Sequence, residues 1–157
     1  MTATYTNGNI SFLYPENWSI SESEEDAADG TSHVTLESPG GGFWYMFSSP
    51  ASANSKNAVR EVMAGIEDQF EGIEWNQTTE PFHGIETTGF DGFFYALDLL
   101  ICARIRVFKT LDRLFVILVQ SENSELDRLA MVYDAITMSL LQSTAPVRQT
   151  AGVSKVP

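Results

Sequence analysis

Four basic residues gather within ten positions of an otherwise acidic chain: Arg104, Arg106, Lys109 and Arg113. On a strand, Arg104 and Arg106 share one face because they lie two positions apart. The fork of N–H donors on arginine suits carboxylates. We therefore take these four as candidate partner-binding residues, for a small anion or an acidic protein surface. The competing interpretation is that they offset the acidic surface through ordinary ion pairs, which contribute little individually.

Candidates for nucleophilic or acid–base chemistry are few. Cys102, the one cysteine, lies in an apolar run and is expected to be buried and inert. Asp91 precedes a glycine and is interpreted as a turn residue. Asp98 interrupts an apolar run, so if it is buried it requires a partner such as Arg104, Arg106 or Arg128. A structural ion pair explains Asp98 better than a catalytic carboxylate, and we expect no enzyme activity.

Two histidines and a triple glycine could in principle hold an ion or a phosphate. A zinc or iron site would need a third ligand that converges on His33 and His83. Each histidine has a glutamate nearby in sequence, Glu37 and Glu86, but at spacings that match no metal motif. The segment Pro39–Gly42 lacks the Lys-Ser/Thr of a phosphate loop and is interpreted as a turn. We expect no metal and no cofactor.

The charge of the chain restricts its partners. The formal net charge is −12, and residues 1–55 carry seven acids with no lysine or arginine. Such a surface repels phosphate backbones, so nucleic acid and anionic membranes are not expected partners. The longest apolar stretch, residues 114–119, is far shorter than the roughly 20 residues of a membrane span. We expect a cytoplasmic protein with a protein partner.

Hydrophobic periodicity predicts two helices. The first runs from Asn54 or Ser55 to Glu71, ahead of Gly72, and places an apolar stripe on one face. The second runs from Ser124 to about Leu141 and begins with a Ser-x-x-Asp capping pattern. Both stripes are interpreted as core faces. The stripe residues are Val59, Val62, Met63, Ile66 and Phe70 in the first helix, and Leu126, Leu129, Ala130, Tyr133, Ile136, Thr137 and Leu140 in the second.

The remaining apolar segments predict strands. Short strands are expected within residues 4–20, a hairpin around the turn at Pro39–Gly42, and further strands at 73–79, 82–90 and 93–108. Residues 114–119 are apolar throughout, which is typical of a strand that is covered on both faces. Such a strand requires helices or loops on each side of the sheet.

These elements predict an α+β domain, a mostly antiparallel sheet with two main helices packed on it as an α/β/α sandwich. We assign residues 1–142 to this single domain. The acidic segment 21–32 is expected to be a solvated loop because it has almost no apolar residue, and residues 143–157 a disordered tail because they show no hydrophobic periodicity.

The segment Ile10–Trp18, ISFLYPENW, resembles the entry segment of the PsbP-like fold family. That family includes the photosystem II extrinsic protein, a small Ran-binding nuclear import factor and many bacterial proteins of unknown function. The resemblance spans roughly residues 9–141. It implies an α+β fold and, for most members, non-enzymatic binding or assembly with differing partners. Pro15 and Trp18 are interpreted as structural, the first fixing φ at a turn and the second closing one end of the core.

Two functional hypotheses follow. The first is a non-enzymatic protein-interaction module that serves as an accessory or assembly factor. The second is a binder of a small hydrophobic molecule, with walls formed by the aromatic residues of segments 43–47 and 93–95. The identity of the partner and the oligomeric state are left open by the sequence.

Overall fold

The computed structural model describes residues 1–23 and 30–143. Half of the predicted acidic loop, residues 24–29, and nearly all of the predicted tail, residues 144–157, lie outside the described residues. The elements are β1 (Thr2–Asn7), β2 (Ile10–Pro15), β3 (Ser19–Ser23), β4 (Ser32–Glu37), β5 (Phe43–Pro50), α1 (Ser55–Glu67), β6 (Glu74–Thr78), β7 (Thr88–Ala96), β8 (Leu99–Lys109), β9 (Arg113–Glu122) and α2 (Asn123–Gln142).

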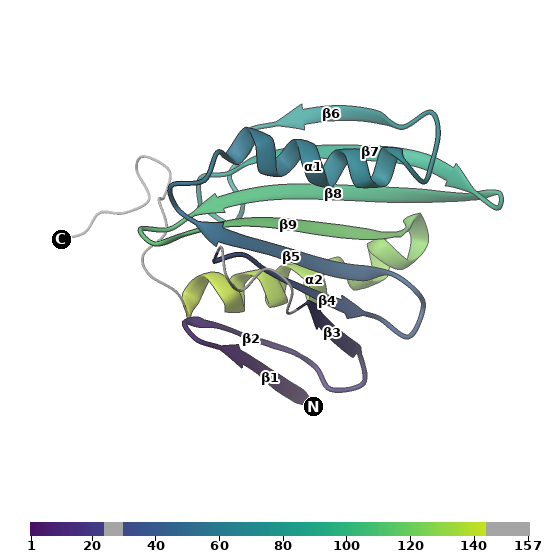
Figure 1. Cartoon of the computed structure of the whole chain (residues 1–157). Coiled ribbons are helices and arrows are strands. Elements are labelled where there is room, and N and C mark those ends of the chain that lie inside the picture. The colour runs from purple at the N-terminus through teal and green to yellow at the C-terminus, as the bar shows by residue number, and fades with distance from the viewer. Residues whose placement is uncertain (24–29, 144–157) are drawn as a thin grey trace.

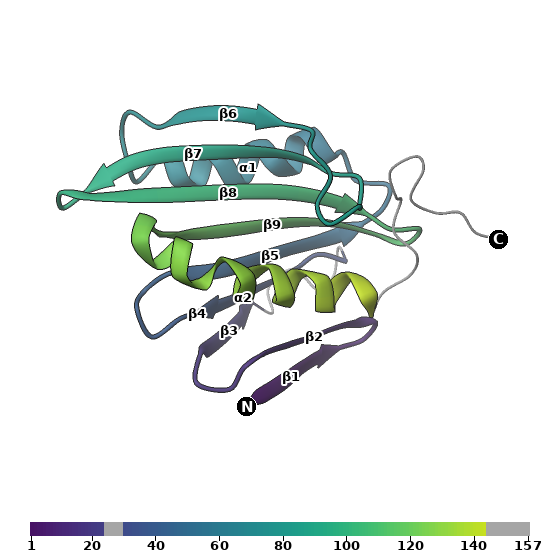
Figure 2. The ribbon, with the colours of Figure 1, turned by 180° about the vertical axis from the view of Figure 1, so that it is seen from behind.

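The strands form an antiparallel sheet with the order β3-β4-β5-β9-β8-β7-β6 and a separate β1–β2 hairpin. Helix α1 packs on one face of the sheet, and α2 packs on the other together with the β1–β2 hairpin (Figures 1 and 2). The predicted α+β architecture, a mostly antiparallel sheet with two helices packed on it, is confirmed.

Strand β9 is the centre of the molecule, as its sequence predicts. Every residue from Leu114 to Val119 is at most 7% exposed. Alternate side chains enter two separate cores: Phe115, Ile117 and Val119 pack on the α2 face, and the intervening residues pack on the α1 face. The continuous apolar run therefore supplies both cores at once.

The segment that carries the family resemblance closes one end of the α2 core. The Trp18 backbone N–H donates to the Pro15 carbonyl at 3.0 Å, which forms the turn after β2. The Trp18 ring packs edge-on against Tyr133 of α2 with ring centroids 5.3 Å apart. Trp18 is 7% exposed. Both residues therefore have the structural roles predicted for them.

Each helix differs from the sequence prediction at one end, α1 at its C-terminal end and α2 at its N-terminal cap. Helix α1 begins where predicted, at Ser55, and Asn54 is its N-cap, since the Asn54 side chain accepts from the N–H groups of Lys56 and Asn57. The helix ends at Glu67 rather than Glu71. The predicted capping pattern at Ser124 is wrong. The N-cap of α2 is Glu122, two residues earlier, whose carboxylate accepts from the N–H groups of Ser124 and Glu125. The hydrogen bonds from Ser124 also lower the pKa of Glu122.

The turn prediction at Asp91-Gly92 is also wrong, because both residues lie within β7. The chain reverses instead at Leu97-Asp98, so the apolar run 93–108 forms two strands rather than one. Within 82–90 the strand begins only at Thr88, after an isolated bridge between Phe82 and Ile85. Neither described helix combines the length and apolarity that a membrane span requires.

Candidate functional site

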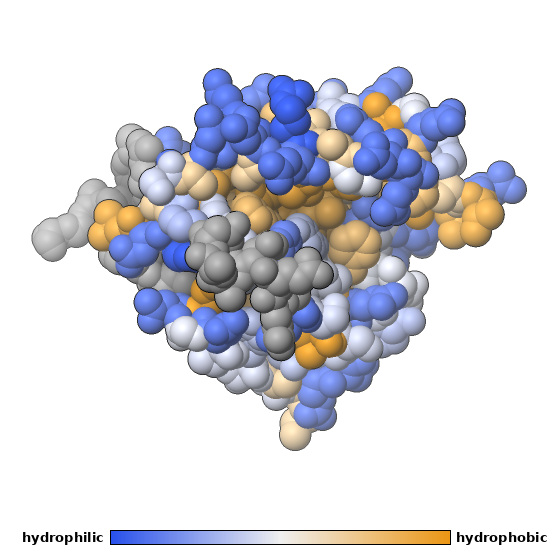
Figure 3. All heavy atoms as spheres, in the orientation of Figure 1, coloured by the Kyte–Doolittle hydropathy of each residue, from blue (hydrophilic) through white to orange (hydrophobic). Residues whose placement is uncertain are grey.

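Helix α1 covers only part of its face of the sheet. Its 13 residues pack on β8 and β9, and one helix about 10 Å wide covers roughly two strands spaced 4.8 Å apart. A groove of about 530 Å³ remains between α1 and strands β4, β5 and β9. We call it the α1 groove. Figure 3 shows apolar side chains gathered in a hollow on this face.

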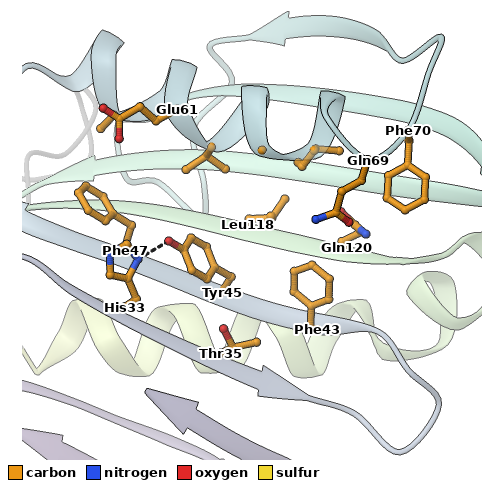
Figure 4. Close-up of a pocket in the computed structure, with 14 residues that line it drawn as sticks. His33, Thr35, Phe43, Tyr45, Phe47, Glu61, Gln69, Phe70, Leu118 and Gln120 are labelled. Atoms are coloured by element: carbon orange, nitrogen blue, oxygen red, sulfur yellow. Dashed lines mark hydrogen bonds between the residues drawn. The ribbon is translucent and has the colours of Figure 1, made fainter. Parts of the chain in front are cut away.

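The floor of the α1 groove is an aromatic row. Phe43, Tyr45 and Phe47 alternate along β5 and are each half-buried. The intervening residue Trp44 points to the other face and is fully buried. Phe70 closes one end of the groove, beside Phe43 (Figure 4). Side chains that alternate along a strand share a face, so this row presents one continuous apolar surface.

The wall of the groove is the side of α1 that turns toward β5. Its lining residues are Ala58, Glu61, Val62, Gly65, Ile66 and Gln69. Gly65 stands in the helix interior, where glycine costs about 1 kcal/mol relative to alanine. A Cβ built on Gly65 meets no atom within 4 Å. No contact within the fold requires a glycine at this position, which leaves the groove open at its middle.

Polar groups mark the rim. The His33 imidazole Nδ1 shares a hydrogen bond with the Tyr45 hydroxyl at 2.5 Å, and the imidazole packs against Phe47 with ring centroids 5.1 Å apart (Figure 4). Glu61 of α1 and Gln69, just after the helix, also line the groove. Over residues 1–23 and 30–143, no group of three or more His, Cys, Asp or Glu side chains could hold a metal ion. The rim therefore offers hydrogen bonds and one carboxylate to an occupant.

The predicted basic cluster does not gather into one surface. Arg106 makes two hydrogen bonds to the Asp91 carboxylate, at 2.9 and 3.4 Å, and its side chain is 17% exposed. Arg104 lies beside the same carboxylate at 3.9 Å. Lys109 points to the opposite face of β8, because it lies an odd number of positions from Arg106. It is exposed.

Arg113 has a role within the fold. Its guanidinium donates to the Ser48 hydroxyl at 2.9 and 2.7 Å and to the Gly30 carbonyl at 2.8 Å. Burial lowers its pKa. The proposal that Arg104, Arg106, Lys109 and Arg113 bind a partner stays a prediction. The contacts place Arg104 and Arg106 together on one face and separate them from Lys109.

The other candidate residues occupy separate places. Asp98 is exposed at a hairpin turn, so the condition under which it would require an arginine partner is not met. The carboxylate that pairs with Arg106 is that of Asp91, whose side chain is 35% exposed. Cys102 is 5% exposed, as predicted, and its thiol donates to Asn123 Oδ1 at 3.3 Å. Burial raises the pKa of that thiol. His83 pairs with Asp134 at 3.1 Å, far along the chain from His33.

The aromatic walls proposed for a hydrophobic ligand are only half correct. The alternate residues of segment 43–47 line the α1 groove. Segment 93–95 does not, because Phe94 is buried beneath α1 while Phe93 and Tyr95 are exposed on the other face of β7. The wall on the α1 side was not predicted, because Val62, Ile66 and Phe70 belong to the apolar stripe that was interpreted as a core face. Gly65 was the available signal, an interior helical glycine beside that stripe.

The fold places the chain among known structures. No protein-family model matches it, and a search of curated proteins returns no match. The solution structure of cyanobacterial PsbP (CyanoP) from Synechocystis sp. PCC 6803 superposes with a TM-score of 0.61 over 88% of this chain and 90% of that one. The chain has the PsbP-like fold. At 14% sequence identity, this likeness establishes the architecture alone.

A second structure is more distant. A Pseudomonas aeruginosa protein of unknown function, described as a putative regulator, matches at a TM-score of 0.44 and 13% identity, over 88% of this chain and 95% of that one. The superposition on cyanobacterial PsbP confirms, at the level of the fold, the resemblance seen in Ile10–Trp18.

Proposed function

We propose that this chain is a non-enzymatic protein-interaction module, an accessory or assembly factor that holds an apolar segment of another protein in the α1 groove. The observation that carries the proposal is the half-buried aromatic row of β5 facing an interior glycine of α1. Aromatic residues are enriched where proteins bind one another, and glycine permits close approach of a partner backbone. Gly65 costs helix stability without a packing reason, so its benefit lies outside the fold.

Charge indicates the chemistry of the occupant. Glu61 lines the groove from α1. Glu37 is exposed on β4 and shares a face with His33 and Thr35, both of which line the groove. The chain as a whole has a net charge of −12. A lysine or arginine beside the apolar segment would therefore strengthen its binding at this site, and an acidic residue would weaken it.

A small hydrophobic molecule is the second candidate. The groove volume of about 530 Å³ lies within the roughly 300–1,000 Å³ of typical ligand sites. The neutral fluorophore N-phenyl-1-naphthylamine is a suitable probe, because it brightens in apolar sites and carries no charge. Binding that Gly65→Trp abolishes and Gly65→Ala preserves would place a small hydrophobic molecule in the α1 groove.

Site-specific photocrosslinking tests the main proposal. A p-benzoylphenylalanine replacing Gln69, which lines the groove, is expected to capture one reproducible protein from the native host. The same residue replacing Gln77, exposed on the edge strand β6, is the matched control and is expected to capture none. Capture should disappear when Gly65→Trp fills the groove and persist with Gly65→Ala. Equal capture from both positions would contradict the proposal.

A further inference from the structure

Strands β7 and β8 extend beyond their neighbours. The pairing of β6 with β7 ends at Glu74 and Phe93, and the pairing of β9 with β8 ends at Glu122 and Ile101. Residues 94–100 therefore form a two-stranded ribbon with no neighbouring strand on either side among the described residues. We call this ribbon the finger. Figures 1 and 2 show it projecting past the ends of β6 and β9.

Apart from Asp98, the exposed side chains of the finger are apolar. Tyr95 is 73% exposed, Leu97 96% and Leu99 50%, and Phe93 at its base is 44% exposed. Figure 3 shows apolar atoms at this end of the molecule. Scattered exposed leucines are ordinary, whereas a contiguous exposed apolar patch marks an interaction site. Leu97 is at the tip, Phe93 and Tyr95 lie on one face of the ribbon and Leu99 on the other, so exposed apolar side chains flank the tip on both faces.

The turn of the finger is built from unfavourable residues. Leu97 has φ of +52° and Asp98 has φ of +65°. A two-residue hairpin turn of this kind is normally Asn-Gly or Asp-Gly, because those residues adopt positive φ at little cost. Leucine adopts it poorly and, at 96% exposure, buries nothing in return. Folding alone does not account for a leucine at the tip.

A lipid surface fits the finger less well than a protein surface does. Asp98, at the tip beside Leu97, would have to enter the membrane first, and carboxylates are costly there. The net charge of −12 also repels anionic headgroups. An apolar groove with hydrogen-bonding groups at its rim has the complementary chemistry.

The α1 groove is such a site, and it lies on the same molecule. Aromatic side chains form its floor, and Gly65 leaves its middle open. The groove therefore matches the apolar side chains of the finger, while Glu61 in its lining disfavours the Asp98 carboxylate and limits the affinity. The finger projects from the end of the sheet, away from its own groove (Figure 1). We propose that the finger of one copy seats in the α1 groove of a second copy, with Leu97 against Gly65. This inference rests on the groove being a binding site, as proposed above.

Finger and groove are different surfaces, so the contact is head-to-tail. A contact of this type leaves one finger and one groove free in every dimer and permits further addition. The finger is small, and interfaces below about 1,200 Å² are typical of weak, transient complexes. Two copies of net charge −12 repel each other, and salt screens this repulsion. We therefore expect self-association in the high micromolar range that strengthens with salt.

Analytical ultracentrifugation of the full chain tests the proposal, from 10 µM to 1 mM protein and from 50 to 500 mM NaCl. The weight-average mass of the wild type should rise past the dimer. Leu97→Ser, which removes the tip, and Gly65→Trp, which fills the groove, should each weaken association at least tenfold. Gly65→Ala should behave as wild type. Circular dichroism and melting temperature verify that each variant is folded.

Mixing the two defective variants is the decisive measurement. Gly65→Trp retains a finger and Leu97→Ser retains a groove, so an equimolar mixture should form a 1:1 dimer and stop there. A wild type that stays monomeric at 1 mM in 500 mM NaCl would overturn the proposal, as would a mixture that stays monomeric. Binding of the wild type, but not of Leu97→Ser, to phosphatidylcholine vesicles would overturn it in favour of a lipid surface.

These outcomes are distinct from a failure of the proposed function. If the wild type is monomeric but the crosslinker at position 69 captures another protein, the groove is a binding site and the second copy is not its occupant. If the crosslinker at position 69 captures nothing and N-phenyl-1-naphthylamine does not bind, the proposed function of the groove and the proposed self-association are both contradicted.

Discussion

Phe70 stacks on Phe94 with ring centroids 4.3 Å apart and ring planes inclined by 28°. Phe70 also closes one end of the α1 groove, while Phe94 stands at the base of the finger and is 3% exposed. One aromatic contact therefore joins the two surfaces to which we assign binding. Both surfaces therefore depend on the position of Phe70, just beyond the C-terminal end of α1.

The two rings should contribute unequally to stability. Phe94→Ala is expected to lower the free energy of unfolding by about 3–5 kcal/mol, the usual cost of removing a buried phenylalanine. Phe70→Ala should cost less, about 2 kcal/mol, because one side of its ring faces the groove. Urea unfolding followed by tryptophan fluorescence measures both. A larger loss for Phe70 than for Phe94 would contradict this account of the contact.

Replacing Gly65 should stabilise the protein. Gly65→Ala adds a side chain that meets no atom within 4 Å, so the gain should be the difference in helix propensity, about 1 kcal/mol. For a chain of this size that corresponds to a rise of about 2–4 °C in melting temperature. The reverse change at the exposed neighbour, Ala64→Gly, should lower stability by a similar amount. A loss of stability in Gly65→Ala would show that the fold itself needs the glycine.

Much of the architecture could be predicted from local patterns. The run at residues 114–119 identified the central strand because only a strand covered on both faces is apolar throughout. The turn at Leu97-Asp98 could not be found, because leucine is not a turn former, Asp98 is not followed by glycine, and Asp91-Gly92 offered a better signal. Its strained backbone is known only from the folded hairpin.

The groove was harder to predict for a different reason. The stripe of α1 shows that the helix packs on a sheet, but not which strands it covers. That choice depends on β8 and β9, which are encoded about forty residues later. Val62, Ile66 and Phe70 therefore have the same pattern as core residues while lining an open site.

The basic cluster gives a stability prediction. Arg106→Glu should lower the free energy of unfolding by about 2 kcal/mol, because hydrogen bonds to a charged group are lost and two carboxylates then face each other. The charge-swapped pair Asp91→Arg with Arg106→Glu should recover part of the loss. Lys109→Glu, at an exposed position on the other face, should change stability little. If Arg106→Glu melts like the wild type, the ion pair has no structural weight, and a partner-binding role for Arg106 gains support.

Tyr133 should make the protein sensitive to alkaline pH. Burial and the nearby charge of Glu125 raise its pKa above the ordinary value of 10.0. The folded state therefore prefers the neutral hydroxyl, so this contribution to stability is complete below pH 10 and is lost as the pH rises toward the folded-state pKa. Tyr133→Phe should lose less stability than the wild type between pH 9 and 11, as measured by urea unfolding. At pH 7 the two proteins should differ by no more than about 1 kcal/mol. Parallel pH profiles would contradict the assignment.

The tip of the finger separates folding from binding most sharply. Leu97→Asn combined with Asp98→Gly supplies the preferred turn residues and removes the cost of a leucine at positive φ, roughly 1–2 kcal/mol. The double variant should therefore unfold at higher urea concentration than the wild type while losing self-association. Leu111→Asn is the matched control, because Leu111 is 76% exposed in the β8–β9 turn outside the finger. It should leave association unchanged. If Leu97 served only the fold, replacing it would destabilise the protein. If Leu97 is a docking residue, replacing it should raise the free energy of unfolding and abolish self-association.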